Sequence, residues 1–189
     1  MKWDLSDRAL RSDFMHAVEA LCGQNVSACY QCGKCSGGCP VLADVEPSPN
    51  RVIRMVQLGL EEDALCNELI WCCTACGICS SRCPMGIDLA RVMDALRALA
   101  EQRGIEPPSE GFAVWTFYRT FLDCVRQFGR LNEVALMQGF NMNSGRVFAN
   151  LRKAPWFFLK GKVSLSPHKI RHIARLQRVF ERVEKLEGK

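Results

Sequence analysis

Eight of the twelve cysteines in this chain form two copies of one spacing, Cys-x-x-Cys-x-x-Cys-x-x-x-Cys-Pro. The first run contains Cys29, Cys32, Cys35 and Cys39, and the second contains Cys73, Cys76, Cys79 and Cys83. Pro40 and Pro84 end the two runs and turn the chain away after the fourth thiol. Three closely spaced thiolates can wrap around one face of a cubane iron–sulfur cluster. The spacing therefore predicts two 4Fe–4S clusters and single-electron chemistry.

The fourth cysteine of each run cannot reach the cluster that its own run surrounds. In two-cluster ferredoxin modules it binds the other cluster. We therefore predict that cluster 1 is bound by Cys29, Cys32, Cys35 and Cys83, and cluster 2 by Cys73, Cys76, Cys79 and Cys39. These eight thiols are the predicted cofactor-binding and metal-binding residues, and no catalytic residue is predicted.

Other uses of the cysteines fit the spacing less well. Zinc sites commonly use two separated pairs of ligands, often with histidine, and none of the three histidines, His16, His168 and His172, lies near the runs. A structural metal scaffold nevertheless stays an alternative. Disulfides are typical of secreted chains, whereas residues 1–10 are polar and do not resemble a signal peptide. Abundant thiols without such a signal predict a cytoplasmic protein.

Composition limits the remaining classes of protein. A chain of 189 residues with 48% hydrophobic content suits one or two small domains. No apolar run is long enough to span a membrane. The formal charge is +5, but each oxidised cluster with four thiolates adds about −2. The loaded protein is then nearly neutral, and without a nucleic-acid-binding motif we expect no nucleic-acid partner.

Each cysteine run is followed by a predicted helix. Ser48 can cap the first, with Pro49 at its first position, and Gly59 lies near its end. Asp88 can cap the second, which continues to about Arg103 and stops at Gly104. The expected apolar faces are Val52, Ile53, Val56 and Leu60 in the first helix, and Leu89, Val92, Met93, Leu96 and Leu99 or Ala100 in the second.

Other segments of residues 1–104 also have helical patterns. We expect a helix over residues 7–22 and one or two short helical turns in residues 61–71, and little in this region resembles a strand. Because helices connect the cysteine runs, we predict an all-α fold. Residues 1–104 would form an α-helical ferredoxin domain with two 4Fe–4S clusters.

Residues 109–189 are predicted to form a helical, aromatic-rich C-terminal extension after the linker at residues 106–108. Ser109 can cap a helix to about Phe128, and a shorter helix is expected at 131–138, a loop at 141–145 and irregular chain at 155–164. A last helix is expected to open at Ser166-Pro167. The first helix has an aromatic-rich face with Phe112, Trp115, Tyr118, Phe121, Leu122 and Val125. We interpret part of this extension as a surface for a partner.

The remaining cysteines and the cations near the first run have simpler interpretations. We expect buried thiols without ligand roles at Cys22, Cys66, Cys72 and Cys124. Cys72 is next to a predicted ligand and could replace Cys73 if that thiol were lost. Arg51 and Arg54 could raise the potential of cluster 1, but a solvated helix face is the simpler interpretation.

Residues 20–98 resemble the small iron–sulfur subunit of heterodisulfide reductase. The similarity is carried by QNVSACYQCGKC at residues 24–35 and then by SGGCP, PNRVIRMVQLGL, IWCCTACGICSSRCP and GIDLARVMDALR, and it includes all eight predicted ligands. Residues 110–180 are similar to the tail of bacterial relatives of that protein. The resemblance implies a hetero-oligomer with two kinds of partner, one that contains flavin and one that carries Cys-Cys-Gly motifs.

This resemblance implies a non-catalytic electron relay between those two partners. Cys72-Cys73 is followed by Thr74, so the chain lacks a Cys-Cys-Gly site, and chemistry on a disulfide would belong to the partner. Two other functions stay open: a free two-cluster ferredoxin-like carrier, and the peripheral iron–sulfur arm of a quinone-linked complex. A free carrier would not need the long C-terminal extension.

Overall fold

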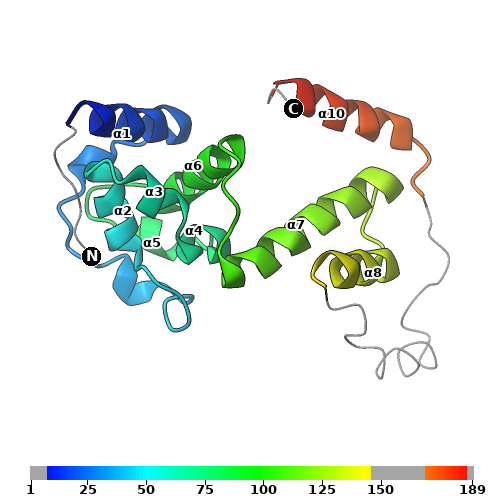
Figure 1. Cartoon of the computed structure of the whole chain (residues 1–189), viewed down its shortest axis with the longest axis horizontal. Coiled ribbons are helices and arrows are strands. Elements are labelled where there is room, and N and C mark those ends of the chain that lie inside the picture. Colours follow the sequence, from blue (N-terminus) through cyan, green and yellow to red (C-terminus); the bar gives the residue numbers. More distant parts are fainter. Residues whose placement is uncertain (1–7, 146–168, 187–189) are drawn as a thin grey trace. The chain divides into compact units, whose positions relative to one another are not determined.

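A computed structural model describes residues 8–145 and 169–186 of the chain (Figure 1). Every regular element in these residues is a helix, which confirms the predicted all-α fold. The chain divides into two compact units, residues 1–114 and 115–189. Helix α7 (Ser109–Phe128) crosses this division, and the linker at residues 106–108 lies directly before it. No helix in the described residues is long and apolar enough to cross a membrane.

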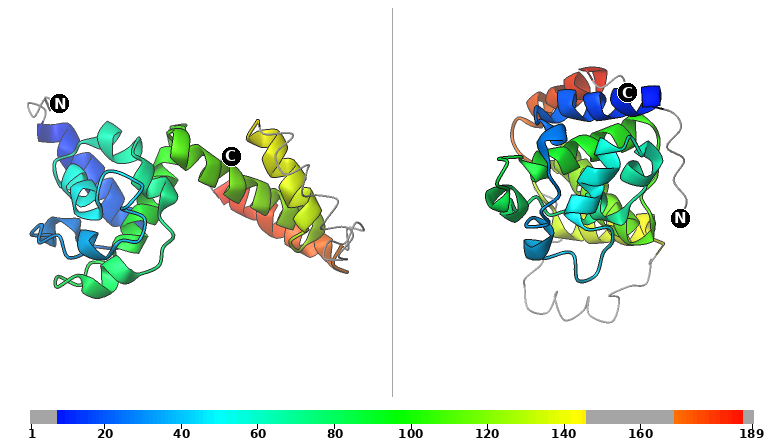
Figure 2. Two further views of the ribbon diagram at one scale, coloured as in Figure 1. Left: turned by 90° about the horizontal axis from the view of Figure 1, so that it is seen from below. Right: turned by 90° about the vertical axis from the view of Figure 1, so that its left-hand side faces the viewer.

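The first unit is built around α6 (Leu89–Gln102). Helix α1 (Arg8–Cys22) lies beside α6 and also contacts α2 (Pro49–Gln57) (Figures 1 and 2). The short helices α3 (Glu61–Leu65), α4 (Glu68–Cys72) and α5 (Ile78–Arg82) pack against other sides of α6. The predicted apolar faces supply much of the core, which includes Val52, Ile53, Val56, Val92, Met93 and Leu96.

The helices α1, α2 and α6 end close to the glycines that the sequence analysis identified. Gly23, Gly59 and Gly104 follow α1, α2 and α6, with φ angles of 64°, 67° and 67°. Glycine adopts this left-handed conformation without a steric penalty and therefore favours a helix end there. Residues 61–71 contain two helical segments, as expected.

The beginnings of α2 and α6 differ from each other. Asp88 caps α6, because its carboxylate accepts a hydrogen bond from the Arg91 N–H at 3.4 Å. Ser48 occupies the N-cap position of α2, but its side chain makes no cap hydrogen bond, so that part of the prediction was wrong. The hydroxyl of Ser36 instead accepts a bond from the Asn50 N–H at 3.1 Å. A residue distant in sequence therefore supplies the hydrogen-bond acceptor for a backbone N–H in the first turn of α2.

Asn67 joins α3 to α4 and thereby places the chain that enters the second cysteine run. Its Oδ1 accepts a bond from the Ile70 N–H at 3.2 Å, and its Nδ2 donates to the Ala64 carbonyl at 2.6 Å. Asn67 is almost fully buried, so these bonds are little exposed to competing water. The turn fixes the direction of α4, which ends directly before Cys73.

The second unit contains the rest of α7 together with α8 (Glu133–Asn143) and α10 (Ile173–Leu186) (Figure 2). Its buried stripe on α7 is Thr116, Thr120, Cys124 and Phe128. Tyr118 and Leu122, on the aromatic-rich face noted in the sequence, are 49% and 52% exposed. The buried stripe of α7 and its aromatic-rich face are therefore different sides of the helix.

Two further predictions for the extension need correction or lie outside the described residues. Helix α8 continues to Asn143, so the segment expected as a loop is mostly helical. Asn132 caps this helix, accepting from the Ala135 N–H at 2.9 Å, and the Asn143 side chain donates to Thr120 Oγ1 at 3.3 Å. The predicted irregular segment 155–164, the Ser166-Pro167 helix start and His168 lie outside the described residues.

Candidate metal centre

The two cysteine runs repeat the same backbone conformation. Gln31 and Ala75, each directly before the second cysteine of its run, have φ angles of 63° and 51°. Gly33 and Gly77, directly after that cysteine, have φ angles of 75° and 74°. A left-handed residue other than glycine is uncommon, and its occurrence at the same place in both runs indicates a shared requirement. Such turns direct backbone N–H groups into a concavity that suits an anionic group.

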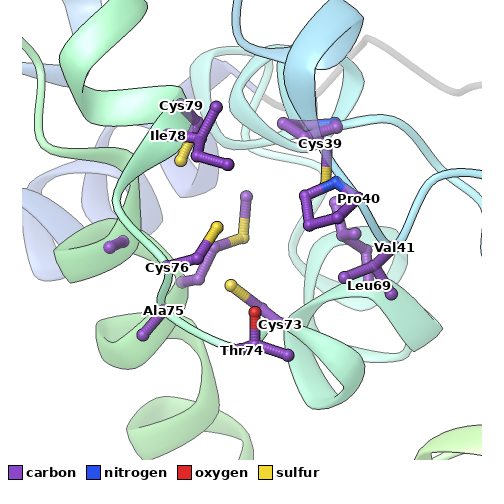
Figure 3. Close-up of a pocket in the computed structure, with 13 residues that line it drawn as sticks. Cys39, Pro40, Val41, Leu69, Cys73, Thr74, Ala75, Cys76, Ile78 and Cys79 are labelled. Carbon is purple, nitrogen blue, oxygen red and sulfur yellow. The ribbon is translucent and has the colours of Figure 1, made fainter.

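Cys39, Cys73, Cys76 and Cys79 line one pocket (Figure 3). Their side chains are directed toward a common space, although Cys39 comes from the first run and the other three from the second. Cys39 follows the turn η2 (Ser36–Gly38), and contacts between η2 and α5 bring the two runs together. The structure thus gathers the four thiols that the spacing assigns to cluster 2.

Apart from Thr74, the other side chains of this pocket are apolar. They include Pro49 at the start of α2, Leu69 of α4 and Met93 of α6. Burial raises the pKa of Cys73 and Cys79, and neighbouring cysteines raise it further. Several thiols in such a place ionise together only if positive charge compensates them. Bound iron supplies that charge and deprotonates its thiol ligands, so the pocket fits a metal–sulfur cluster.

Polar groups beside the sulfurs oppose the effect of burial. Burial is the main cause that raises the pKa of Cys73 and Cys79, whereas the Ala75 backbone lowers the pKa of Cys73, and the Ser80 side chain and backbone lower that of Cys79. In the first run the Gln31 side chain donates to Cys29 Sγ at 3.6 Å. Hydrogen bonds to ligand sulfurs stabilise their negative charge and help to set the potential of a bound cluster.

The thiols assigned to cluster 1 are also neighbours. The pKa of Tyr30 is raised, first by desolvation and then by a hydrogen bond to Cys32 and by the charges of Cys32, Cys83 and Cys29. Cys35 is buried, its pKa is raised mainly by this burial, and Cys29 adds to the effect. Cys32 is exposed, and Tyr30 is 59% exposed. Cys76, the counterpart of Cys32 in the second run, is also exposed, so each run presents its second thiol to solvent.

A serine after the third cysteine of each run attaches that run to the next helix. Ser36 Oγ donates to Asn50 Oδ1 at 2.5 Å and accepts from the Asn50 N–H. Ser80 Oγ donates to Asp88 Oδ1 at 2.6 Å and accepts from the Ala90 N–H at 3.5 Å. The Ser80 bond is the largest cause that lowers the pKa of Asp88. Sequence analysis missed both serines, although their equal place in the two runs is a visible signal.

No group of three or more His, Cys, Asp or Glu side chains in the described residues is close enough to hold a single metal ion. The four thiols of Figure 3 instead border a pocket. His16 is exposed and lies 3.7 Å from Glu19, and His172 is exposed. Neither histidine lines this pocket.

The cysteines outside the runs divide into two groups. Cys22 and Cys124 are buried, as predicted. Cys124 stabilises the turn after α7, because its Sγ accepts a bond from the Asn132 N–H at 3.2 Å. Cys72 is half-buried, and Cys66 is exposed, so the prediction of burial was wrong for Cys66. Cys66 follows the last residue of α3, where the chain turns toward α4.

Residues 25–87 match the protein family described as a 4Fe-4S dicluster domain. The matched segment contains all eight cysteines of the two runs. No curated protein matches the chain. The match and the pocket lined by cysteines agree with two 4Fe–4S clusters, and the domain supports a role in iron–sulfur electron transfer.

Proposed function

We propose that this chain is the electron-transfer iron–sulfur subunit of a heterodisulfide reductase-type complex. It would relay single electrons between a flavoprotein and a protein that converts disulfides and thiols. The observation that carries the proposal is the crossed set of thiols, in which Cys39 of the first run joins three thiols of the second. When bound, a 4Fe–4S cluster accepts and releases one electron at a time.

The residues around the thiols perform the tasks that a relay needs. Apolar side chains such as Leu69 and Met93 limit the access of water to the pocket. Ser36 and Ser80 hold the cysteine turns against α2 and α6. Because each run is predicted to contribute ligands to both clusters, the same two segments would fix the clusters as neighbours.

The resemblance of residues 20–98 to the small iron–sulfur subunit of heterodisulfide reductase supports the assignment to such a complex. The second run has Thr74 where a Cys-Cys-Gly motif would have glycine, so we assign disulfide chemistry to a partner. The chain itself would be a non-catalytic relay.

Exposed side chains of α7 support a hetero-oligomer more than a free carrier. Phe117, Tyr118 and Leu122 are 40%, 49% and 52% exposed. Aromatic residues of this kind are enriched at protein interfaces. We propose that this part of the second unit contacts the flavin-containing partner or the Cys-Cys-Gly partner, in the cytoplasm.

The test is anaerobic purification of the tagged full-length chain from its own host. Iron and labile sulfide are measured, and the proteins that accompany the chain are identified by mass spectrometry. We expect about eight iron and eight sulfide per chain, as two 4Fe–4S clusters require, together with a flavoprotein and a Cys-Cys-Gly protein. A cluster-loaded monomer would instead support the free carrier, and co-purification with a membrane quinone reductase would support the peripheral-arm alternative. Zinc without iron or sulfide would overturn all three electron-transfer functions.

A further inference from the structure

The internal repeat extends beyond the cysteines to the residues that hold the first ligand of each run. Gln57 and Arg97 each lie nine residues after the N-cap residue of their helix, Ser48 in α2 and Asp88 in α6. The Gln57 Nε2 donates to the Cys29 carbonyl at 2.8 Å. The Arg97 Nη1 donates to the Cys73 carbonyl at 3.3 Å. The two side chains therefore make the same contact in the two repeats.

These equivalent residues differ in charge. Gln57 is neutral, whereas Arg97 carries a positive charge directly beside a predicted ligand of cluster 2. The Arg97 side chain is only 22% exposed, and its guanidinium forms an ion pair with Asp94 one helical turn earlier, which is 58% exposed. Because Arg97 reaches the Cys73 carbonyl and is paired with Asp94, both the guanidinium and the carboxylate lie close to this predicted ligand.

The first repeat has a cation in the position that Asp94 occupies in the second. Arg54 lies six residues after Ser48, as Asp94 lies six residues after Asp88, and it donates to Gln57 Oε1 at 3.2 Å. Arg54 is exposed and borders an open pocket with Cys29 and Tyr30. Water and salt screen an exposed charge more strongly than a largely buried one. Arg54 should therefore affect a bound cluster less than Arg97 does.

We propose that Arg97 is a positioning residue that raises the reduction potential of cluster 2, and that Asp94 orients its guanidinium while partly offsetting its charge. Reduction adds one negative charge to a cluster, and a nearby cation stabilises that charge. The second repeat would then provide the more easily reduced cluster of the relay. The inference rests on the proposed function only in requiring that both clusters are bound.

The test is an anaerobic redox titration of the cluster-loaded chain, isolated with any partners, and followed by electron paramagnetic resonance. Arg97→Gln is the central variant, because glutamine already makes this contact in the other repeat. We expect it to lower one of the two potentials by about 59 mV, which corresponds to a tenfold change for a one-electron couple. Asp94→Asn should raise the same potential. Arg97→Lys keeps the positive charge, so its potential should be close to that of the wild type. Arg54→Gln is the matched exposed control and should shift the other potential by less.

Several results would overturn the inference. One is an unchanged potential in Arg97→Gln, another is an equal shift of both potentials, and a third is a shift of Asp94→Asn in the same direction as Arg97→Gln. Iron content and helical circular dichroism are measured for each variant. If Arg97→Gln loses iron, Asp94→Asn still decides the sign, because it removes the opposing negative charge. Two clusters with unshifted potentials would refute this inference but leave the proposed function intact, whereas a wild-type chain without clusters would refute the function.

Discussion

Gly111 allows α7 to begin directly against a buried tryptophan near the second cysteine run. A Cβ atom at Gly111 would lie 2.8 Å from the Cβ of Trp71 and 3.2 Å from its Cγ. Trp71 is 3% exposed and lies in α4, two residues before Cys73. Carbon atoms pack best at about 3.5–4.0 Å. A methyl group at residue 111 must therefore displace either α7 or the Trp71 side chain.

We predict that Gly111→Ala destabilises the first unit although alanine is the better helix former. The gain in helix propensity is at most about 1 kcal/mol, and overpacking a well-filled site costs about 1–3 kcal/mol. The net loss is then about 1 kcal/mol, which lowers the Tm of a 114-residue unit by about 4 °C. Because Trp71 is close to Cys73, the loss should also appear as earlier release of cluster 2.

The assay is anaerobic heating of the loaded chain at one fixed rate, followed by cluster absorbance and helical circular dichroism. A fixed rate is needed because cluster loss makes unfolding irreversible. Gly37→Ala is the matched control, because a Cβ atom there would meet no other atom within 4 Å. An unchanged or raised Tm in Gly111→Ala would refute the contact between Gly111 and Trp71.

Three further predictions concern the core, the cysteine turns and the remaining thiols. Leu96→Ala removes a side chain with 0% exposure and should lower the free energy of unfolding by about 2–5 kcal/mol, measured as a lower apparent Tm. Leu186→Ala, at an 81% exposed site, is the control. An equally small change in both variants would contradict the packing of α6. Ser36→Ala and Ser80→Ala should each cost about 1 kcal/mol and accelerate cluster release in denaturant, whereas Ser81→Ala, which loses only a bond to the Ile78 carbonyl of its own helix, should not. In the native chain Cys66 should react with a maleimide before Cys22 and Cys124, because it alone of these three is exposed; mass spectrometry after brief labelling would reveal a different order.

The sequence by itself determined the chemistry and most of the helices of the first unit. Cysteine spacing is a local property, because three thiols within seven residues already describe the loop that surrounds a cluster. The apolar faces of α2 and α6 and the glycines that end them are also local, since helix periodicity and left-handed conformation depend on neighbouring residues. The apolar faces and the glycines at the helix ends were therefore correctly predicted without any contact information, and the match of residues 25–87 to a 4Fe-4S dicluster domain supports the iron–sulfur chemistry.

The tertiary structure decided which groups meet across the sequence. It brought Cys39 into one pocket with the thiols of the second run. It placed the Ser36 hydroxyl where it accepts a hydrogen bond from the first turn of α2. It also placed Arg97 and Gln57 where they donate to equivalent carbonyls of the two runs. It also buried Thr120 in α7 and left Tyr118 exposed. Each outcome depends on how closely two distant backbones approach, and the period of a single helix contains no information on that distance. The residue types thus set which chemistry is possible, and packing selected the contacts that position and tune it.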